Sequence, residues 1–193
     1  KVDAALAAFP DVQAVQFFSN ALNTRTRGLD LQVMYPFLVG NGVLTVSGAA
    51  NFNKTEIRGA VRKPTGLGAG TPLFNRQERS YFTTALPESK FILTTQYGVG
   101  NFSAVARATR FGSAQSINLF GPDEVVPAAV LMDLNVGYQF GRLGLEAGGN
   151  NIFDKYPPLQ NPANGYFGIF KYSRVTPYGI RGAYFYTSAK LTL

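Results

Sequence analysis

The chain has 193 residues, and its 18 Lys and Arg against 11 Asp and Glu give a formal net charge of +7 at pH 7. It contains no histidine and no cysteine, which excludes a Ser-His-Asp triad, a thiolate nucleophile, a disulfide and any metal site that needs either residue. Hydrophobic residues make up 46% of the sequence, so we do not expect a disordered chain. We predict no catalytic residue, no cofactor and no enzyme activity.

Apolar and polar residues alternate along most of the chain, which indicates β-strands. Between Val130 and Phe140, for example, the even-numbered residues are apolar or aromatic, while Asp133, Asn135 and Gln139 fall on the other side. No stretch of 18 consecutive apolar residues occurs, so we expect no transmembrane helix. We expect about eight strands, over residues 12–19, 24–38, 43–57, 89–99, 102–112, 130–140, 143–150 and 181–193, with a helical turn near 76–83.

The expected connections alternate between tight and long. Short turns containing glycine are predicted at 39–42, 100–101 and 141–142, and long loops at about 58–88, 113–129 and 151–180. Because the two kinds alternate from strand to strand, we expect all the long loops at one end of the sheet and the tight turns at the other.

The alternation alone fits two opposite arrangements, since a soluble barrel has its apolar side chains inside and an outer-membrane barrel has them outside. Aromatic residues lie near the strand ends, as in a membrane protein with aromatic girdles, and Asp30, Asp133 and Glu146 fall on the polar face. An Arg at the bilayer midplane costs roughly 2–4 kcal/mol, but about 0–1 kcal/mol near the interface. We therefore expect Arg107, in mid-strand, to point inward, and we predict an all-β, antiparallel transmembrane β-barrel.

Basic residues are concentrated in two of the long loops, where they suit capture of an anionic small molecule. The alternative is contact with lipopolysaccharide phosphates or with water. The acidic pair Asp123-Glu124 offers too few ligands for a calcium site, and the scattered basic residues do not suggest nucleic-acid binding. The candidate capture residues are Arg58, Arg62, Lys63, Arg76, Arg79, Lys171 and Arg174.

A polar run ends the last predicted hairpin. Its Asn and Asp side chains can hydrogen-bond to the local backbone and Pro157 prevents the strand from continuing, so we expect a structural role. The run resembles the C-terminal barrel signature of TonB-dependent outer-membrane receptors, and residues 23–31 and 182–193 resemble other barrel segments of that family. The run is Asn150, Asn151, Ile152, Phe153, Asp154, Lys155, Tyr156 and Pro157.

The resemblance implies that residues 1–193 form the C-terminal part of a larger 22-stranded barrel, without its plug domain. It also implies a place in the bacterial outer membrane, in contact with lipid and lipopolysaccharide. The receptor would take up a scarce nutrient, such as a ferric siderophore, with energy from the TonB complex, which contacts an N-terminal region outside this sequence. Two alternatives remain: a stand-alone eight-stranded outer-membrane barrel with an anchoring or adhesion role, and a soluble ligand-binding β-barrel.

Overall fold

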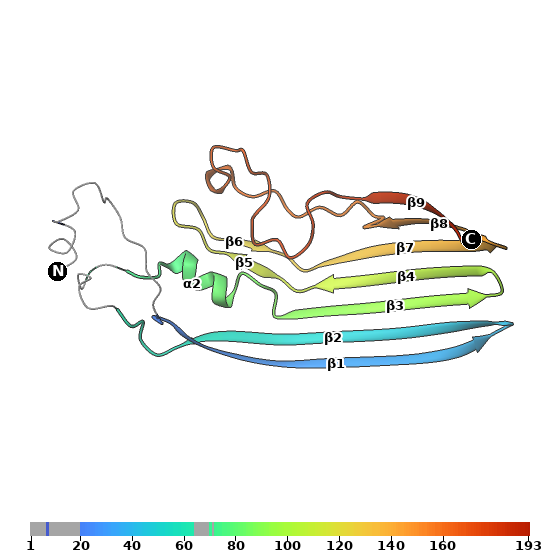
Figure 1. Cartoon of the computed structure of the whole chain (residues 1–193). Helices are drawn as coiled ribbons and strands as arrows, with labels where there is room; N and C mark the ends of the chain where they lie inside the picture. Colours follow the sequence, from blue (N-terminus) through green and yellow to red (C-terminus); the bar gives the residue numbers. More distant parts are fainter. Residues whose placement is uncertain (1–6, 8–19, 64–69, 71) are drawn as a thin grey trace.

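The computed structural model describes residue 7, residues 20–63, residue 70 and residues 72–193, and most of these residues belong to one antiparallel sheet (Figure 1). The strand expected at 12–19 lies outside the described residues. The other predicted strands are confirmed with small shifts at their ends. The seven strands of the sheet are β1 (Asn23–Val39), β2 (Gly42–Arg58), β3 (Ser89–Val99), β4 (Phe102–Phe111), β7 (Ala129–Phe140), β8 (Leu143–Asn150) and β9 (Tyr184–Leu191).

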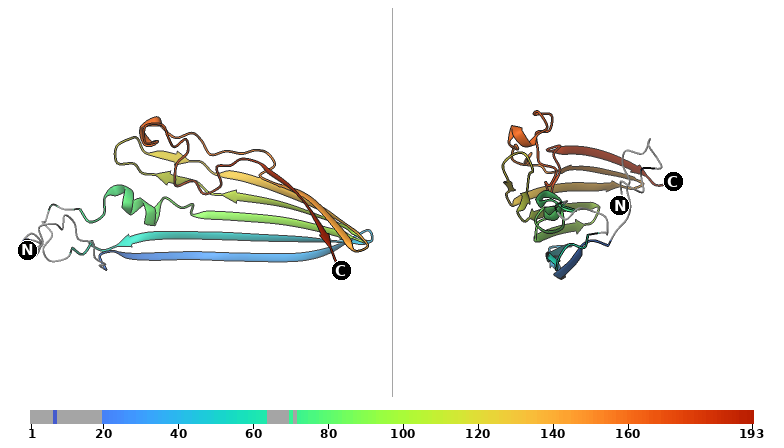
Figure 2. Two further views of the ribbon diagram at one scale, coloured as in Figure 1. Left: turned by 45° about the horizontal axis from the view of Figure 1, so that its top comes forward. Right: turned by 90° about the vertical axis from the view of Figure 1, so that its left-hand side faces the viewer.

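The strands of the sheet lie side by side in chain order, β1-β2-β3-β4-β7-β8-β9, and β5 (Ala114–Ser116) and β6 (Glu124–Val126) pair only with each other. The three tight turns stand where they were predicted, and each contains a glycine with positive φ: Gly40 at 60°, Gly100 at 53° and Gly141 at 56°. Residues with a Cβ rarely adopt this conformation, so glycine permits the short reversals. β1 and β9 are not paired with each other, and the sheet remains an open arc (Figure 2).

The three long connections gather at the opposite end from the tight turns (Figure 1). The first contains helix α2 (Arg76–Thr83), as predicted, with Asn75 and Glu78 forming a capping box at its start. The second, expected to lack regular structure, contains a small hairpin of β5 (Ala114–Ser116) and β6 (Glu124–Val126). The third contains the short 3-10 helix η1 (Pro162–Asn164). Neither helix among the described residues has the length and apolar character needed to cross a membrane.

The strand register keeps the apolar side chains on one face, which we call the apolar face. Leu134, Val136 and Leu145 on this face are 42%, 48% and 41% exposed, so no second layer covers them. Among the described residues no large side chain is fully buried. One row of paired residues on this face runs through Leu31, Ala50, Phe91, Arg110 and Val130.

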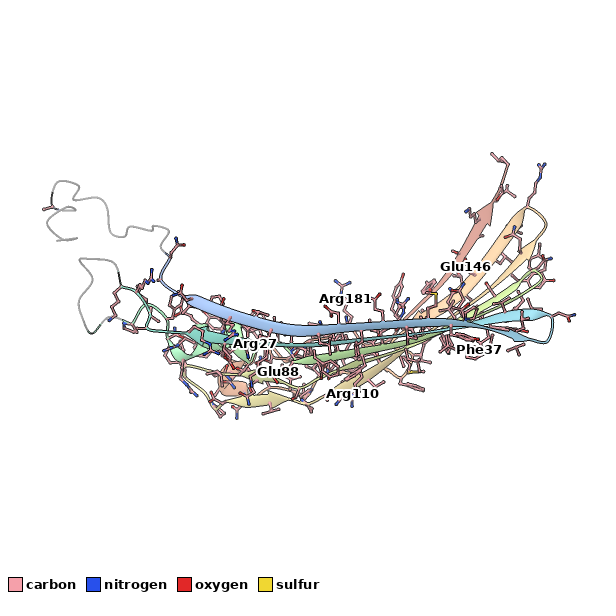
Figure 3. All side chains as sticks on the ribbon, turned by 90° about the horizontal axis from the view of Figure 1, so that it is seen from below. Arg27, Phe37, Glu88, Arg110, Glu146 and Arg181 are labelled. Carbon is pink, nitrogen blue, oxygen red and sulfur yellow. The ribbon has the colours of Figure 1, made fainter. Side chains whose placement is uncertain are left out.

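The opposite face, the polar face, carries the charged side chains of mid-strand. Arg107 on β4 is paired with Asp133 on β7, so it stands on the polar face as expected. Figure 3 shows the two faces on the curved sheet: Phe37 and Arg110 lie on the outer side of the curve, and Glu146 lies on the inner side. The sheet therefore bends toward its polar face.

A glycine on the polar face allows a tyrosine to lie across the sheet. Gly148 on β8 is paired with Tyr186 on β9, and a Cβ at Gly148 would stand 2.5 Å from the Tyr186 ring. The amide of Asn135 on β7 donates to the Tyr186 hydroxyl at 3.1 Å. The tyrosine thus connects β9 to β7 across the glycine of the strand between them.

We predict that Gly148→Ala destabilises the sheet by about 1–3 kcal/mol, because the new methyl group displaces the tyrosine ring. Gly98→Ala is the matched control, since Gly98 lies on the same face and a Cβ there meets no atom within 4 Å. The control should leave stability unchanged or raise it by up to about 1 kcal/mol. Equilibrium unfolding in denaturant measures both changes, and equal effects would contradict the packing role of Gly148.

Candidate functional site

A cleft of about 780 Å³ lies at the loop end of the molecule. It is formed by α2, by the segment 116–121 that begins with the last residue of β5, and by the long loop 151–183. Segments that are distant in the sequence therefore build one site, and its shape depends on how the loops are joined.

Asp123 joins the β5–β6 hairpin to α2. Its carboxylate pairs with the Arg76 guanidinium and accepts from the backbone N–H of Asn118 at 3.0 Å. Arg76 also donates to the Asn118 carbonyl at 3.3 Å. The Asn118 N–H and, after it, Arg76 hold the pKa of Asp123 below its ordinary value of 3.8, since both stabilise the carboxylate.

Glu124 joins the same hairpin to the loop 151–183. It accepts from the Asn161 N–H at 2.6 Å and from the Asn164 side-chain amide, which also donates to the Pro122 carbonyl at 2.9 Å. The carboxylates of Asp123 and Glu124 thus link loops together, and neither lines the cleft. The side-chain amide oxygen of Asn164, Oδ1, is buried and has no hydrogen-bond partner among the described residues.

The lining combines aromatic rings with neutral polar groups and one charged side chain, Arg174. The Arg174 guanidinium lies 5.4 Å from the ring centre of Tyr81 on α2. Tyr178 is buried, and its ring centre lies 5.9 Å from that of Phe111. Burial raises the pKa of the Tyr178 hydroxyl. No Asp or Glu is present among the described lining residues. The cleft therefore suits a ligand with an apolar or aromatic part and a negative charge.

The predicted capture residues do not form one cluster. Arg174 lines the cleft, Lys171 lies in the same loop, and Arg76 and Arg79 stand on α2 beside it. Arg58 is the last residue of β2, Arg62 and Lys63 follow this strand, and none of the three is among the lining residues. Arg58 donates to Glu56 at 2.6 Å, and the Arg62 backbone N–H donates to the Ala21 carbonyl. The prediction placed all these basic residues in one capture site, but in the fold Arg58, Arg62 and Lys63 lie apart from the lining of the cleft.

Several lining residues were not predicted from the sequence. Ser116, Asn118 and Gln160 carry polar groups into the cleft region, and Tyr178 contributes a buried ring. Each is an ordinary loop residue in the sequence. The only local signal was the density of aromatic and basic residues between positions 166 and 174, which marked one wall of the cleft.

The signature run begins at Asn150, the last residue of β8, and continues as the first part of the loop 151–183. Asn151 is buried and has φ of 50°, a conformation that asparagine tolerates better than most residues. Its side chain donates to the Lys155 carbonyl at 2.9 Å and accepts from the Lys155 N–H at 3.0 Å. Its own N–H donates to Asp133 on β7 at 2.9 Å. Asn151 therefore closes a tight turn and attaches it to the sheet.

Asp154 joins the beginning of this loop to its end. Its carboxylate accepts from the Ala183 N–H at 2.8 Å, one residue before β9 begins. The Tyr156 hydroxyl hydrogen-bonds to the same carboxylate, whose charge raises the tyrosine pKa. Gly182 has φ of 72°, and a Cβ there would collide with Tyr156 and Asp154. The hydrogen bond between Asp154 and Ala183 closes the loop 151–183 at its base. The middle part of the loop lines the cleft.

An open, curved antiparallel sheet with an uncovered apolar face and long loops at one end has the construction of part of a large β-barrel. The family described as "TonB dependent receptor-like, beta-barrel" matches residues 2–152. The chain belongs to this family.

One similar solved structure is described as "Copper transporter OprC", with a TM-score of 0.50 and 19% sequence identity. The match covers 88% of this chain and 23% of that one, so this chain spans less than a quarter of its structural relative. A comparison with curated proteins gives no match.

We predict that the link between the β5–β6 hairpin and α2 depends on pH through Asp123. Because the pKa of Asp123 is lowered in the folded state, its contribution is complete above its ordinary value of 3.8 and is lost as the pH falls through the lowered value. Cleavage between β5 and β6 by an acid-active protease such as pepsin should therefore accelerate steeply below about pH 4. Asp123→Asn should be cleaved rapidly across this range without the steep step. An identical step in the variant would contradict the role of Asp123.

Proposed function

We propose that this chain forms part of the wall and the outer mouth of an outer-membrane receptor that imports a small nutrient with energy from the TonB complex. The family supports the transport class. The observation that carries the proposal is the combination of an exposed apolar face across the whole sheet with a ligand-sized cleft at its loop end.

The apolar face has the dimensions of a membrane-spanning surface. On β1 it extends from Leu29 to Phe37, and a transmembrane strand needs about 9–11 residues. Aromatic pairs stand toward both ends of the sheet: Phe52 with Phe91 at 5.2 Å, and Tyr138 with Phe140 at 4.4 Å. Aromatic rings prefer the two interfaces of a bilayer, so this order supports lipid contact on the apolar face.

The open edges support a larger assembly rather than a stand-alone small barrel. β1 and β9 each have one neighbour among the described strands, and unpaired backbone groups at a lipid-exposed edge are costly. Further strands of a longer chain would pair with these edges and close the barrel. The polar face would then line the bore, where the resemblance to TonB-dependent receptors places a plug domain.

The cleft favours an anionic small molecule, such as a ferric chelate, over a bare metal ion. Its volume lies within the range of about 300–1,000 Å³ that small-molecule sites occupy. Arg174 supplies positive charge and the aromatic rings supply apolar contact, whereas copper and other soft ions prefer Cys, Met or His ligands. The described lining contains no Met, and the sequence has no His or Cys.

We predict that Arg174→Gln weakens binding of the imported anionic chelate about tenfold or more, because a hydrogen bond to a charged group contributes roughly 1.5–3 kcal/mol. The measurement is uptake of radiolabelled iron from a panel of ferric chelates by cells that express the full-length receptor, with and without TonB. Uptake should require TonB, and the variant should raise the concentration for half-maximal uptake.

Arg142→Gln is the matched control, since it removes the same charge at the tight turn between β7 and β8, at the opposite end of the sheet. It should leave uptake unchanged. TonB-independent uptake would contradict the proposed mechanism, and equal effects of the two variants would remove Arg174 from the ligand site.

A further inference from the structure

Five basic side chains stand on the apolar face toward the loop end: Arg110 is level with Phe91 of the aromatic pair Phe52–Phe91, and the other four lie just beyond this pair. Leu29 on β1 is paired with Phe52 on β2, and the next pair on the same face toward the loop end is Arg27 with Lys54. On β4 the Arg110 guanidinium lies 5.6 Å from the Phe91 ring centre. We call this group the basic rim; its members are Arg25, Arg27, Lys54, Arg58 and Arg110.

The polar face at the same level of β1 and β2 is uncharged. The residues there are Thr and Ile, and the hydroxyls of Thr26 and Thr55 lie 2.8 Å apart. Exposure on β2 alternates accordingly, with Lys54, Glu56 and Arg58 exposed and the residues between them half-buried. The cations therefore point away from the bore. A ligand that enters the bore would pass neutral side chains here, so capture does not explain these charges.

The basic rim has more positive charge than its carboxylates neutralise. Arg58 pairs with Glu56 at 2.6 Å, and Lys54 lies 3.9 Å from Glu88. Within the described part of the chain, Arg25, Arg27 and Arg110 form no salt bridge. Five basic groups against two carboxylates leave a surplus of three positive charges on an exposed surface.

We propose that the basic rim binds the phosphate groups of a phosphorylated glycolipid, lipopolysaccharide, whose acyl chains lie on the apolar face below. The position fits, because cations directly beyond an aromatic belt stand at the depth of lipid headgroups. The chemistry fits as well, since arginine binds phosphate through two parallel N–H donors. The proposal rests on the lipid-facing orientation argued under the proposed function, and it assigns Arg58 to lipid contact rather than ligand capture.

The test compares two probes on the full-length receptor in detergent micelles: lipopolysaccharide with its lipid phosphates, and the same glycolipid after phosphatase treatment. The variant combines Arg25→Gln, Arg27→Gln and Lys54→Gln. Each basic residue near an anionic surface contributes about fivefold to binding, so the triple variant should bind the phosphorylated glycolipid about a hundredfold more weakly. Its affinity should approach that of the unmodified receptor for the dephosphorylated glycolipid, as measured by calorimetry.

The matched control removes three basic side chains outside the basic rim, through Arg142→Gln, Lys155→Gln and Arg181→Gln, and should bind lipopolysaccharide as the unmodified receptor does. Heat-dependent gel mobility shows that each variant has formed its barrel. Equal binding by the rim variant and the control would overturn the proposal, as would equal affinity of the unmodified receptor for both probes. TonB-dependent uptake, measured on the same variants, reports on the proposed function separately, because no rim residue in the triple variant lines the cleft.

Discussion

The two-residue period of the strands, kept in register across the sheet, is the constraint on which the structure depends. Successive side chains point to opposite faces, so a slip of one residue in any strand would exchange its apolar and polar sets. The pairing avoids this from β1 to β9, and it places Arg107 opposite Asp133 on the polar face while Leu134 and Val136 remain on the other. No second layer of the described residues covers the apolar face, and the proposed function places lipid against it.

The same topology creates the site. Glycine turns at one end leave the long connections together at the other, where carboxylates act as links between loops. Asp123 holds the hairpin to α2, Glu124 holds it to the loop 151–183, and Asp154 closes that loop at its base. These acids are engaged in contacts between loops, and Arg174 is the charged side chain among the described lining residues. Its positive charge makes the cleft suitable for an anionic ligand.

The sequence predicts the long strands well because alternation over ten or more residues is a strong local signal, as between Val130 and Phe140. It also predicts α2 and the face of Arg107. The three-residue strands β5 and β6 are too short to show a period, and they were missed. The cleft was missed because it depends on contacts such as Glu124 with Asn161, 37 residues apart in the chain. Arg58 was expected at the start of a loop, because the strand was predicted to end at residue 57. β2 continues to Arg58, and the strand places its side chain on the apolar face.

Lipid contact of the apolar face is the central claim, and nitroxide scanning along β7 tests it most directly. These 193 residues contain no cysteine. Single cysteines are introduced from Val130 to Phe140 in the full-length receptor, any cysteine elsewhere in that receptor is replaced by serine, and the single-cysteine variants are labelled in bilayers. Oxygen, which is concentrated in the hydrocarbon layer, should broaden the signals of labels at Met132, Leu134 and Val136, and a water-soluble nickel reagent should broaden those at Asp133 and Asn135. A reversed pattern, or no alternation between neighbouring positions, would contradict the account.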